Sequence, residues 1–232
     1  MISPKIDSLQ KEIIACRKCP RLVKWREAVA KKKVRRFMDW EYWGKPVPSF
    51  GDANARLLVV GLAPAAHGGN RTGRVFTGDE SASWLYRALH RAGYANQPFS
   101  TDRNDNLKLT DCYITAACHC APPLNKLLPT EIRNCRPYML EELSLLRNLR
   151  VIVGLGKIGF EAVFDSVREL GWTSLKARPK FGHAVSYAIT DKIILLGSYH
   201  PSQQNTFTGK LTEKMLDDVF RKARRAITLK RS

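Results

Sequence analysis

Acidic residues are scarce in this sequence of 232 residues, and long apolar runs are absent. Only 21 Asp and Glu stand against 39 Lys and Arg, which gives a net charge of +18. No apolar run approaches the length needed to cross a bilayer, and the polar start Met1–Asp7 lacks the apolar core of a signal peptide. We therefore expect an intracellular protein whose partners are rich in phosphate, either nucleic acid or an anionic membrane surface.

Internal repeats and low-complexity tracts are also absent, which leaves an ordinary folded domain as the simplest organisation. Short apolar runs alternate with segments of helical character, a pattern typical of parallel βαβ units. The apolar runs lie at residues 57–60, 112–115, 151–153 and 193–196. Helices are expected at residues 8–15, 81–92, 129–146, 157–170 and 212–226. We predict one α/β domain over residues 1–232, with a central four-stranded parallel sheet in three layers, α/β/α.

The six cysteines do not form the compact double Cys-x-x-Cys pattern of a zinc ribbon. In a reducing compartment they indicate metal ligands, catalysis or packing rather than disulfides. Cys16 and Cys19 form one pair, and Cys120 and Cys135 stand far downstream, so the four can tie the amino-terminal segment onto the core through zinc or an iron–sulfur cluster. This spacing favours the cluster, with Cys118 as a competing ligand and unligated cysteines as the alternative.

Clustered carboxylates are missing from the two loops where a ligand is expected. The loop Gly61–Asp79 follows the run at 57–60, and the loop Gly197–Gly209, which contains His200, follows the last predicted strand. In open α/β sheets, ligands bind at such carboxyl ends of strands. Because Asp79 is the only carboxylate in these loops, a metal-dependent nuclease is disfavoured. Solvated connections and a structural histidine remain the alternatives.

A dinucleotide-binding pattern is present but incomplete. Residues Gly154–Gly159 match Gly-x-Gly-x-x-Gly at the start of a predicted helix, yet no acidic residue follows about twenty residues later to hold a ribose. Close packing of helix on strand explains these glycines better than NAD binding. The amides at this helix start can also hold a DNA phosphate.

Positive charge is concentrated in Lys31–Arg36, which is followed by Trp40, Tyr42 and Trp43. Cations beside aromatic rings suit a nucleic-acid surface, because cations pair with phosphates and rings stack on bases. Such a run is also typical of a solvated face, but the charge excess of the whole chain favours nucleic acid.

Four segments together resemble the family 5, or type b, uracil-DNA glycosylases: Cys16–Leu22, Pro46–Asp52, Gly61–Asp79 and His200–Thr208. The resemblance implies a four-stranded parallel sheet between helices and a [4Fe–4S] cluster on Cys16, Cys19, Cys120 and Cys135, with zinc as the alternative. It also implies a monomer that excises uracil, hypoxanthine and related deaminated bases from double-stranded DNA containing damaged or mismatched bases. Such an enzyme is expected in the cytoplasm, associated with the nucleoid through DNA, without membrane contact.

Two alanines distinguish this chain from other uracil-DNA glycosylases. Ala63 stands where many of them carry an Asp or Glu, as it does in type b members, and Ala116 where relatives place an Asn that recognises uracil. We therefore expect Asp79 to position or deprotonate the attacking water and His200 to stabilise the departing base. The missing Asn predicts a pocket that accepts several deaminated bases.

The remaining site residues follow from the same resemblance. Phe76 is expected to stack on the flipped base in a pocket formed by Leu62, Ala63, Pro64, Ala65, His67, Asn70, Phe76 and Ala116. The residues expected to contact DNA are Arg71, Arg74, Ser202, Gln203, Gln204 and Asn205. The alternative is a metal-stapled nucleic-acid-binding module without chemistry, which would not need Asp79 and His200 on separate strand-end loops.

Overall fold

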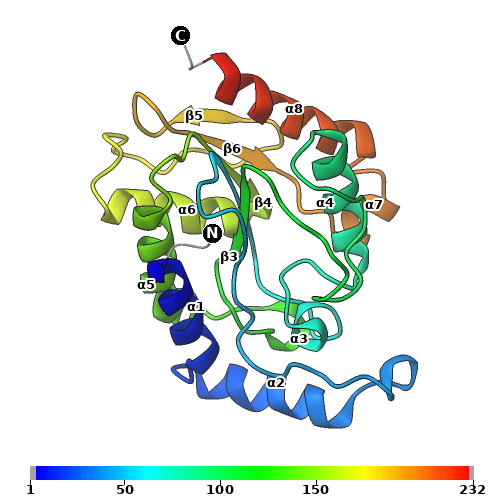
Figure 1. The fold of residues 1–232 in the computed structure, drawn as a ribbon. Coiled ribbons are helices and arrows are strands. Elements are labelled where there is room, and N and C mark those ends of the chain that lie inside the picture. Colours follow the sequence, from blue (N-terminus) through cyan, green and yellow to red (C-terminus); the bar gives the residue numbers. More distant parts are fainter. Residues whose placement is uncertain (1–3, 230–232) are drawn as a thin grey trace.

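The computed structural model describes residues 4–229. Both ends of the predicted domain, residues 1–3 in the polar start and residues 230–232, lie outside the described residues. The chain forms one six-stranded sheet in the order β1-β3-β2-β4-β6-β5, with helices on both of its faces (Figure 1). The predicted α/β class is therefore confirmed.

The strands are β1 (Phe50–Gly51), β2 (Leu57–Gly61), β3 (Cys112–Ala116), β4 (Val151–Leu155), β5 (Ser186–Ala188) and β6 (Ile194–Ser198). The helices are α1 (Pro4–Ala15), α2 (Pro20–Lys32), α3 (Gly69–Thr72), α4 (Glu80–Arg91), α5 (Pro129–Leu145), α6 (Gly156–Glu169), α7 (Gln203–Phe207) and α8 (Glu213–Leu229). Two 3₁₀ turns complete the elements, η1 (Arg35–Phe37) and η2 (Pro123–Asn125). Within residues 4–229, no helix combines the length and apolar character needed to cross a bilayer.

The sheet has six strands rather than the predicted four. β3, β2, β4 and β6 are the predicted strands and pair in parallel, whereas β1 and β5 pair antiparallel at the two edges. These edge strands have two and three residues, too few to produce an alternating pattern in the sequence. The prediction also missed α2, α3 and α7.

Two apolar layers cover the parallel strands, which are buried on both faces. On one face, strand residues such as Val59 pack with Leu85 of α4 and Phe220 of α8. On the other, Leu58 packs with side chains of α5 and α6 such as Phe164. Because consecutive strand residues point to opposite faces, the apolar runs supply both layers. The parallel strands therefore hold the loops at their carboxyl ends in fixed positions.

The incomplete dinucleotide pattern has a packing role. A Cβ on Gly159 would lie 2.6 Å from the carbonyl oxygen of Val60, and one on Gly154 would lie 2.5 Å from Cα of Phe160. Such distances are far below van der Waals contact, so both positions require glycine. The glycines let α6 approach the sheet closely, as the packing interpretation predicts.

Candidate active site

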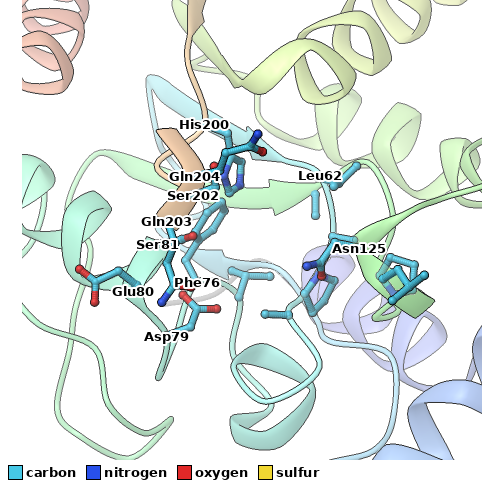
Figure 2. A pocket seen from close by; sticks show the side chains of 17 residues that line it. Leu62, Phe76, Asp79, Glu80, Ser81, Asn125, His200, Ser202, Gln203 and Gln204 are labelled. Atoms are coloured by element: carbon cyan, nitrogen blue, oxygen red, sulfur yellow. The ribbon is translucent and has the colours of Figure 1, made fainter. Parts of the chain in front are cut away.

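A pocket of about 650 Å³ opens at the carboxyl ends of β2, β3 and β6 (Figure 2). Three loops, which follow these strands, and the start of α4 form its walls. Predicted site residues in the lining are Leu62, Ala63, Pro64, Ala65, Phe76, Asp79, Ala116, His200, Ser202, Gln203 and Gln204. The structure thus brings together residues from both loops that the sequence selected.

Asp79 occupies the end of the first loop and caps α4. Its Oδ1 accepts a hydrogen bond of 2.9 Å from the N–H of Ala82. The other oxygen, Oδ2, lies against Gly68, where a Cβ would come within 2.2 Å of it. Burial raises the pKa of the Asp79 carboxyl, while the Ala82 N–H and the charge of Arg71 lower it in part. The Asp79 side chain is therefore held in a fixed orientation in one wall of the pocket.

His200 lies across the pocket, two residues after the end of β6. Burial lowers the pKa of its imidazole to about 4, so the ring is neutral near pH 7 and can donate one N–H without bringing a charge. Asn205 donates a hydrogen bond of 2.8 Å from Nδ2 to the carbonyl of His200. Asn205, which the sequence assigned to DNA contact, thus uses its amide within the protein to hold the loop that carries His200.

Phe76 lies between these two groups. Its ring centroid is 5.9 Å from that of His200, with the planes 30° apart. A Cβ on Gly61 would come within 2.7 Å of the Phe76 ring, so the glycine at the end of β2 leaves the space that the ring fills. The backbone of Phe76 has a φ of 47°, which is strained for an aromatic residue and occurs most often at functional sites.

Two residues predicted to bind the base do not line the pocket. Asn70 is completely buried, and its Nδ2 donates to the carbonyls of Arg26 and Ala66 at 3.2 and 3.5 Å. His67 lies outside the pocket, with Nδ1 3.1 Å from the hydroxyl of Tyr42. Asn70 Nδ2 and His67 Nδ1 thus make contacts within the protein, and neither residue is among those that line this pocket.

The two arginines of this loop are also held inside the protein. Arg74 is buried and forms an ion pair of 2.7 Å with Asp105. The guanidinium of Arg71 is buried between the rings of Phe37 and Trp40, 3.9 and 4.0 Å from their centroids. Arg74 is therefore engaged inside the protein, whereas Arg71, although almost fully buried, still lines a second groove beside the pocket.

The sequence interpretation missed one wall of the pocket, the turn that follows β3. Its residues Pro122, Leu124 and Asn125 line the pocket, together with Glu80 and Ser81 at the start of α4. Asn125 has a φ of 55°, and its amide points toward the cavity (Figure 2). The Pro-Pro-Leu-Asn segment that ends at Asn125 carries a turn signal in the sequence, a few residues after the buried strand β3.

The four predicted ligand cysteines belong to one region of the structure. Cys16, Cys19, Cys120 and Cys135 belong to one apolar cluster with Cys118, between the α1–α2 turn, the loop after β3 and α5. Three N–H groups point at their sulfurs: Arg26 Nη1 at 3.0 Å from Cys120, the His119 amide at 3.4 Å from Cys135, and Asn134 Nδ2 at 3.5 Å from Cys19. Among residues 4–229, no three His, Cys, Asp or Glu side chains are placed so that they could hold a metal ion.

Comparison with known proteins places the chain in a family. The Uracil DNA glycosylase superfamily profile matches residues 48–224. The chain is 50% identical to a type-5 uracil-DNA glycosylase of Mycobacterium bovis over 214 residues, covering 92% of this chain and 78% of that protein. A type-5 uracil-DNA glycosylase of Mycobacterium leprae is 49% identical over 95% of this chain and 95% of that protein. One of Thermus thermophilus is 47% identical over 92% of this chain and 94% of that protein.

Proposed function

The chain belongs to the uracil DNA glycosylase superfamily and is a type-5 uracil-DNA glycosylase, and from this we propose how its pocket releases a base from DNA. A uracil-DNA glycosylase hydrolyses the bond between a base and its deoxyribose and acts on DNA. The observation that carries the proposal is the placement of Asp79 and His200 in one pocket with the Phe76 ring between them. One copy of the chain supplies every residue of this pocket, so we propose that it acts as a monomer.

The damaged nucleotide rotates out of the duplex and its base enters the pocket. Flipping costs a few kcal/mol, less for a mismatched base, so mismatched and damaged bases enter more readily. The base stacks on Phe76, and the volume of about 650 Å³ is ample for a single base. Gln203 and Gln204, both exposed at the start of α7, enter the duplex where the base has left.

As the N-glycosidic bond breaks, its electron pair leaves with the base and positive charge develops on the sugar. The Asp79 carboxylate stabilises that charge and orients the water whose oxygen bonds to the sugar carbon. The neutral His200 donates an N–H to the base as negative charge develops on it. One proton of the water stays on its oxygen as the new sugar hydroxyl and the other neutralises the departing base, so the products are the free base and an abasic site.

We propose that hypoxanthine and related deaminated bases are released as well as uracil. Ala116, at the end of β3, presents only a methyl group to the pocket, so no side chain there selects one pattern of donors and acceptors. The Asn125 amide lines the pocket from the loop after β3, and it can both donate and accept a hydrogen bond. We attribute the broad specificity to this arrangement, in which the polar group facing the base is Asn125 on a loop and the strand position holds only Ala116.

We further propose that Cys16, Cys19, Cys120 and Cys135 hold a [4Fe–4S] cluster. A four-iron cluster takes one thiolate per iron, so its ligands need not meet at one point. The charge of Arg26 fits this assignment, because the side chain is buried, no carboxylate among the described residues pairs with it, and it donates to Cys120. A buried cation needs an anionic partner, which metal-bound thiolates provide. When bound, the cluster would connect the α1–α2 turn to the loop after β3 and to α5. Zinc is the alternative, and Cys118 is the competing ligand.

Incubation with uracil- and hypoxanthine-containing duplexes, followed by detection of abasic sites, tests the proposal. We expect release of both bases from double-stranded DNA and no strand cleavage at undamaged positions. Release of uracil alone would contradict the broad specificity. DNA binding with no release of either base would favour the non-catalytic binding module instead.

A further inference from the structure

A second groove, of about 690 Å³, adjoins the base pocket. The two share a wall made of Ala65, Asp79, Glu80, Asn125 and Gln203. We call this space the flanking groove, and its outer wall is formed by Arg36, Phe37 and Trp40. A DNA strand that delivers one nucleotide to the base pocket must continue over a rim of that pocket. The flanking groove continues from the base pocket and offers that strand a path.

Contacts of Arg71 join the outer wall to the loop Gly61–Asp79, which we call the catalytic loop. The Arg71 guanidinium is stacked 3.9 Å from the ring centroid of Phe37 and 4.0 Å from that of Trp40. Its Nε donates to the carbonyl of His67 at 2.7 Å, and its Nη2 donates to the carbonyl of Gly78 at 3.1 Å. The aromatic rings are thereby tied to the loop that carries Asp79, and the groove does not need to form when DNA binds.

Positive charge without a partner collects at the outer wall. Arg71 is buried and Arg36 is exposed, and no carboxylate among the described residues forms an ion pair with either. Burial lowers the pKa of the Arg71 guanidinium and the charge of Arg36 lowers it further, against the opposing effect of Asp102 and Asp79. An anion beside Arg36 would relieve this repulsion. Since Asp79 and Glu80 line the shared wall, an anion in this groove is favoured at the outer end, beside Arg36.

We propose that the flanking groove binds the nucleotide next to the flipped one, with its phosphate beside Arg36 and its base against Trp40. This inference rests on the proposed function, because it requires that a base is flipped from DNA. Flipping leaves the neighbouring base with one unstacked face, and the indole ring replaces the lost contact. The basic and aromatic segment that the sequence placed on a nucleic-acid surface thus has a defined position in the complex.

Fluorescence anisotropy with a duplex containing a tetrahydrofuran abasic site, and with the same duplex undamaged, tests this. Trp40→Ala should weaken binding to the abasic duplex about tenfold and leave the undamaged duplex nearly unaffected, since base stacking on an aromatic ring contributes that much. Trp40→Phe should restore most of the difference. Arg36→Gln should lower the slope of log affinity against log salt by about 0.9 for the abasic duplex. The control is Lys192→Gln, an exposed charge before β6 at the opposite end of the sheet, which should change neither slope nor selectivity.

Equal losses on both duplexes, or no loss with Trp40→Ala, would overturn the assignment. So would an Arg36→Gln slope equal to that of the wild type. Thermal unfolding of each variant shows whether the stack with Arg71 has collapsed, and in that case Trp40→Phe, which keeps a ring, decides the question. Because these measurements use binding alone, wild-type protein that binds the abasic duplex selectively but releases no base would refute the proposed base release and would leave the flipping on which this inference rests.

Discussion

Single side chains in this pocket serve both the fold and the chemistry. Asp79 caps α4 through Oδ1 and also lines the cavity, so removing it tests two roles at once. Asp79→Asn separates them, because asparagine caps a helix about as well as aspartate but carries no charge. We expect Asp79→Asn to unfold like the wild type and to release uracil at least 100-fold more slowly under single-turnover conditions.

Asp79→Ala should in addition lose about 1 kcal/mol of stability, because the helix cap is gone. Thermal unfolding of the two variants shows this difference directly. If Asp79→Asn released uracil at the wild-type rate, Asp79 would be only a helix cap and another polar group of the pocket, such as Asn125, would orient the water.

His200 predicts a defined pH dependence. Its pKa is lowered from 6.5 to about 4 by burial, so between these values the unfolded chain binds the proton more readily than the folded one. The contribution of His200 to stability is therefore complete above pH 6.5 and is lost as the pH falls toward 4. Urea unfolding at several pH values should show a smaller acid loss for His200→Gln than for the wild type. A wild-type excision rate that rose on acidification through pH 6.5 would contradict catalysis by a neutral imidazole.

At the scale of elements, the short helix α3 separates the site residues that could be predicted from the sequence from those that could not. The sequence placed Phe76, Asp79 and His200 correctly in the pocket, because residues after buried strands meet at one edge of a sheet. It could not show that four residues, Gly69–Thr72, form a single helical turn inside the glycine-rich loop. That turn points Asn70 and Arg71 into the protein, and so short a helix leaves no periodic signal.

Arg74 illustrates the consequence for stability. Its guanidinium pairs with Asp105 in a buried position and also donates to Ser100 at 2.7 Å, which connects the catalytic loop to the segment before β3. Arg74→Ala should destabilise the protein by about 3 kcal/mol, because it leaves the Asp105 charge buried without a partner. Urea unfolding measures this loss. Adding Asp105→Asn should recover part of it, whereas a variant as stable as the wild type would show that the pair contributes nothing.

Over the whole molecule, the cysteine cluster connects elements that are distant in sequence. Most of the parallel sheet and its covering helices could be predicted because apolar runs and helical segments alternate. The position of α2 could not, since it is fixed by contacts with residues about a hundred positions away, such as the hydrogen bond from Arg26 to Cys120. A cluster on these cysteines would hold the amino-terminal helices against the loop after β3, which is also a wall of the base pocket.

Removal of single cysteines tests this long-range tie. In protein purified anaerobically, Cys120→Ser should lose iron and its visible absorbance, and amides of α1 and α2 should exchange hydrogen faster, because the helices lose their anchor. Cys118→Ser, a neighbouring buried cysteine in the same apolar cluster, is the matched control and should keep iron. If Cys118→Ser lost iron and Cys120→Ser kept it, Cys118 would be the ligand and Cys120 would not. A colourless wild-type protein with one zinc and no iron would replace the cluster with a zinc site, yet it would leave the prediction for α1 and α2 unchanged, since either metal joins the same four thiolates.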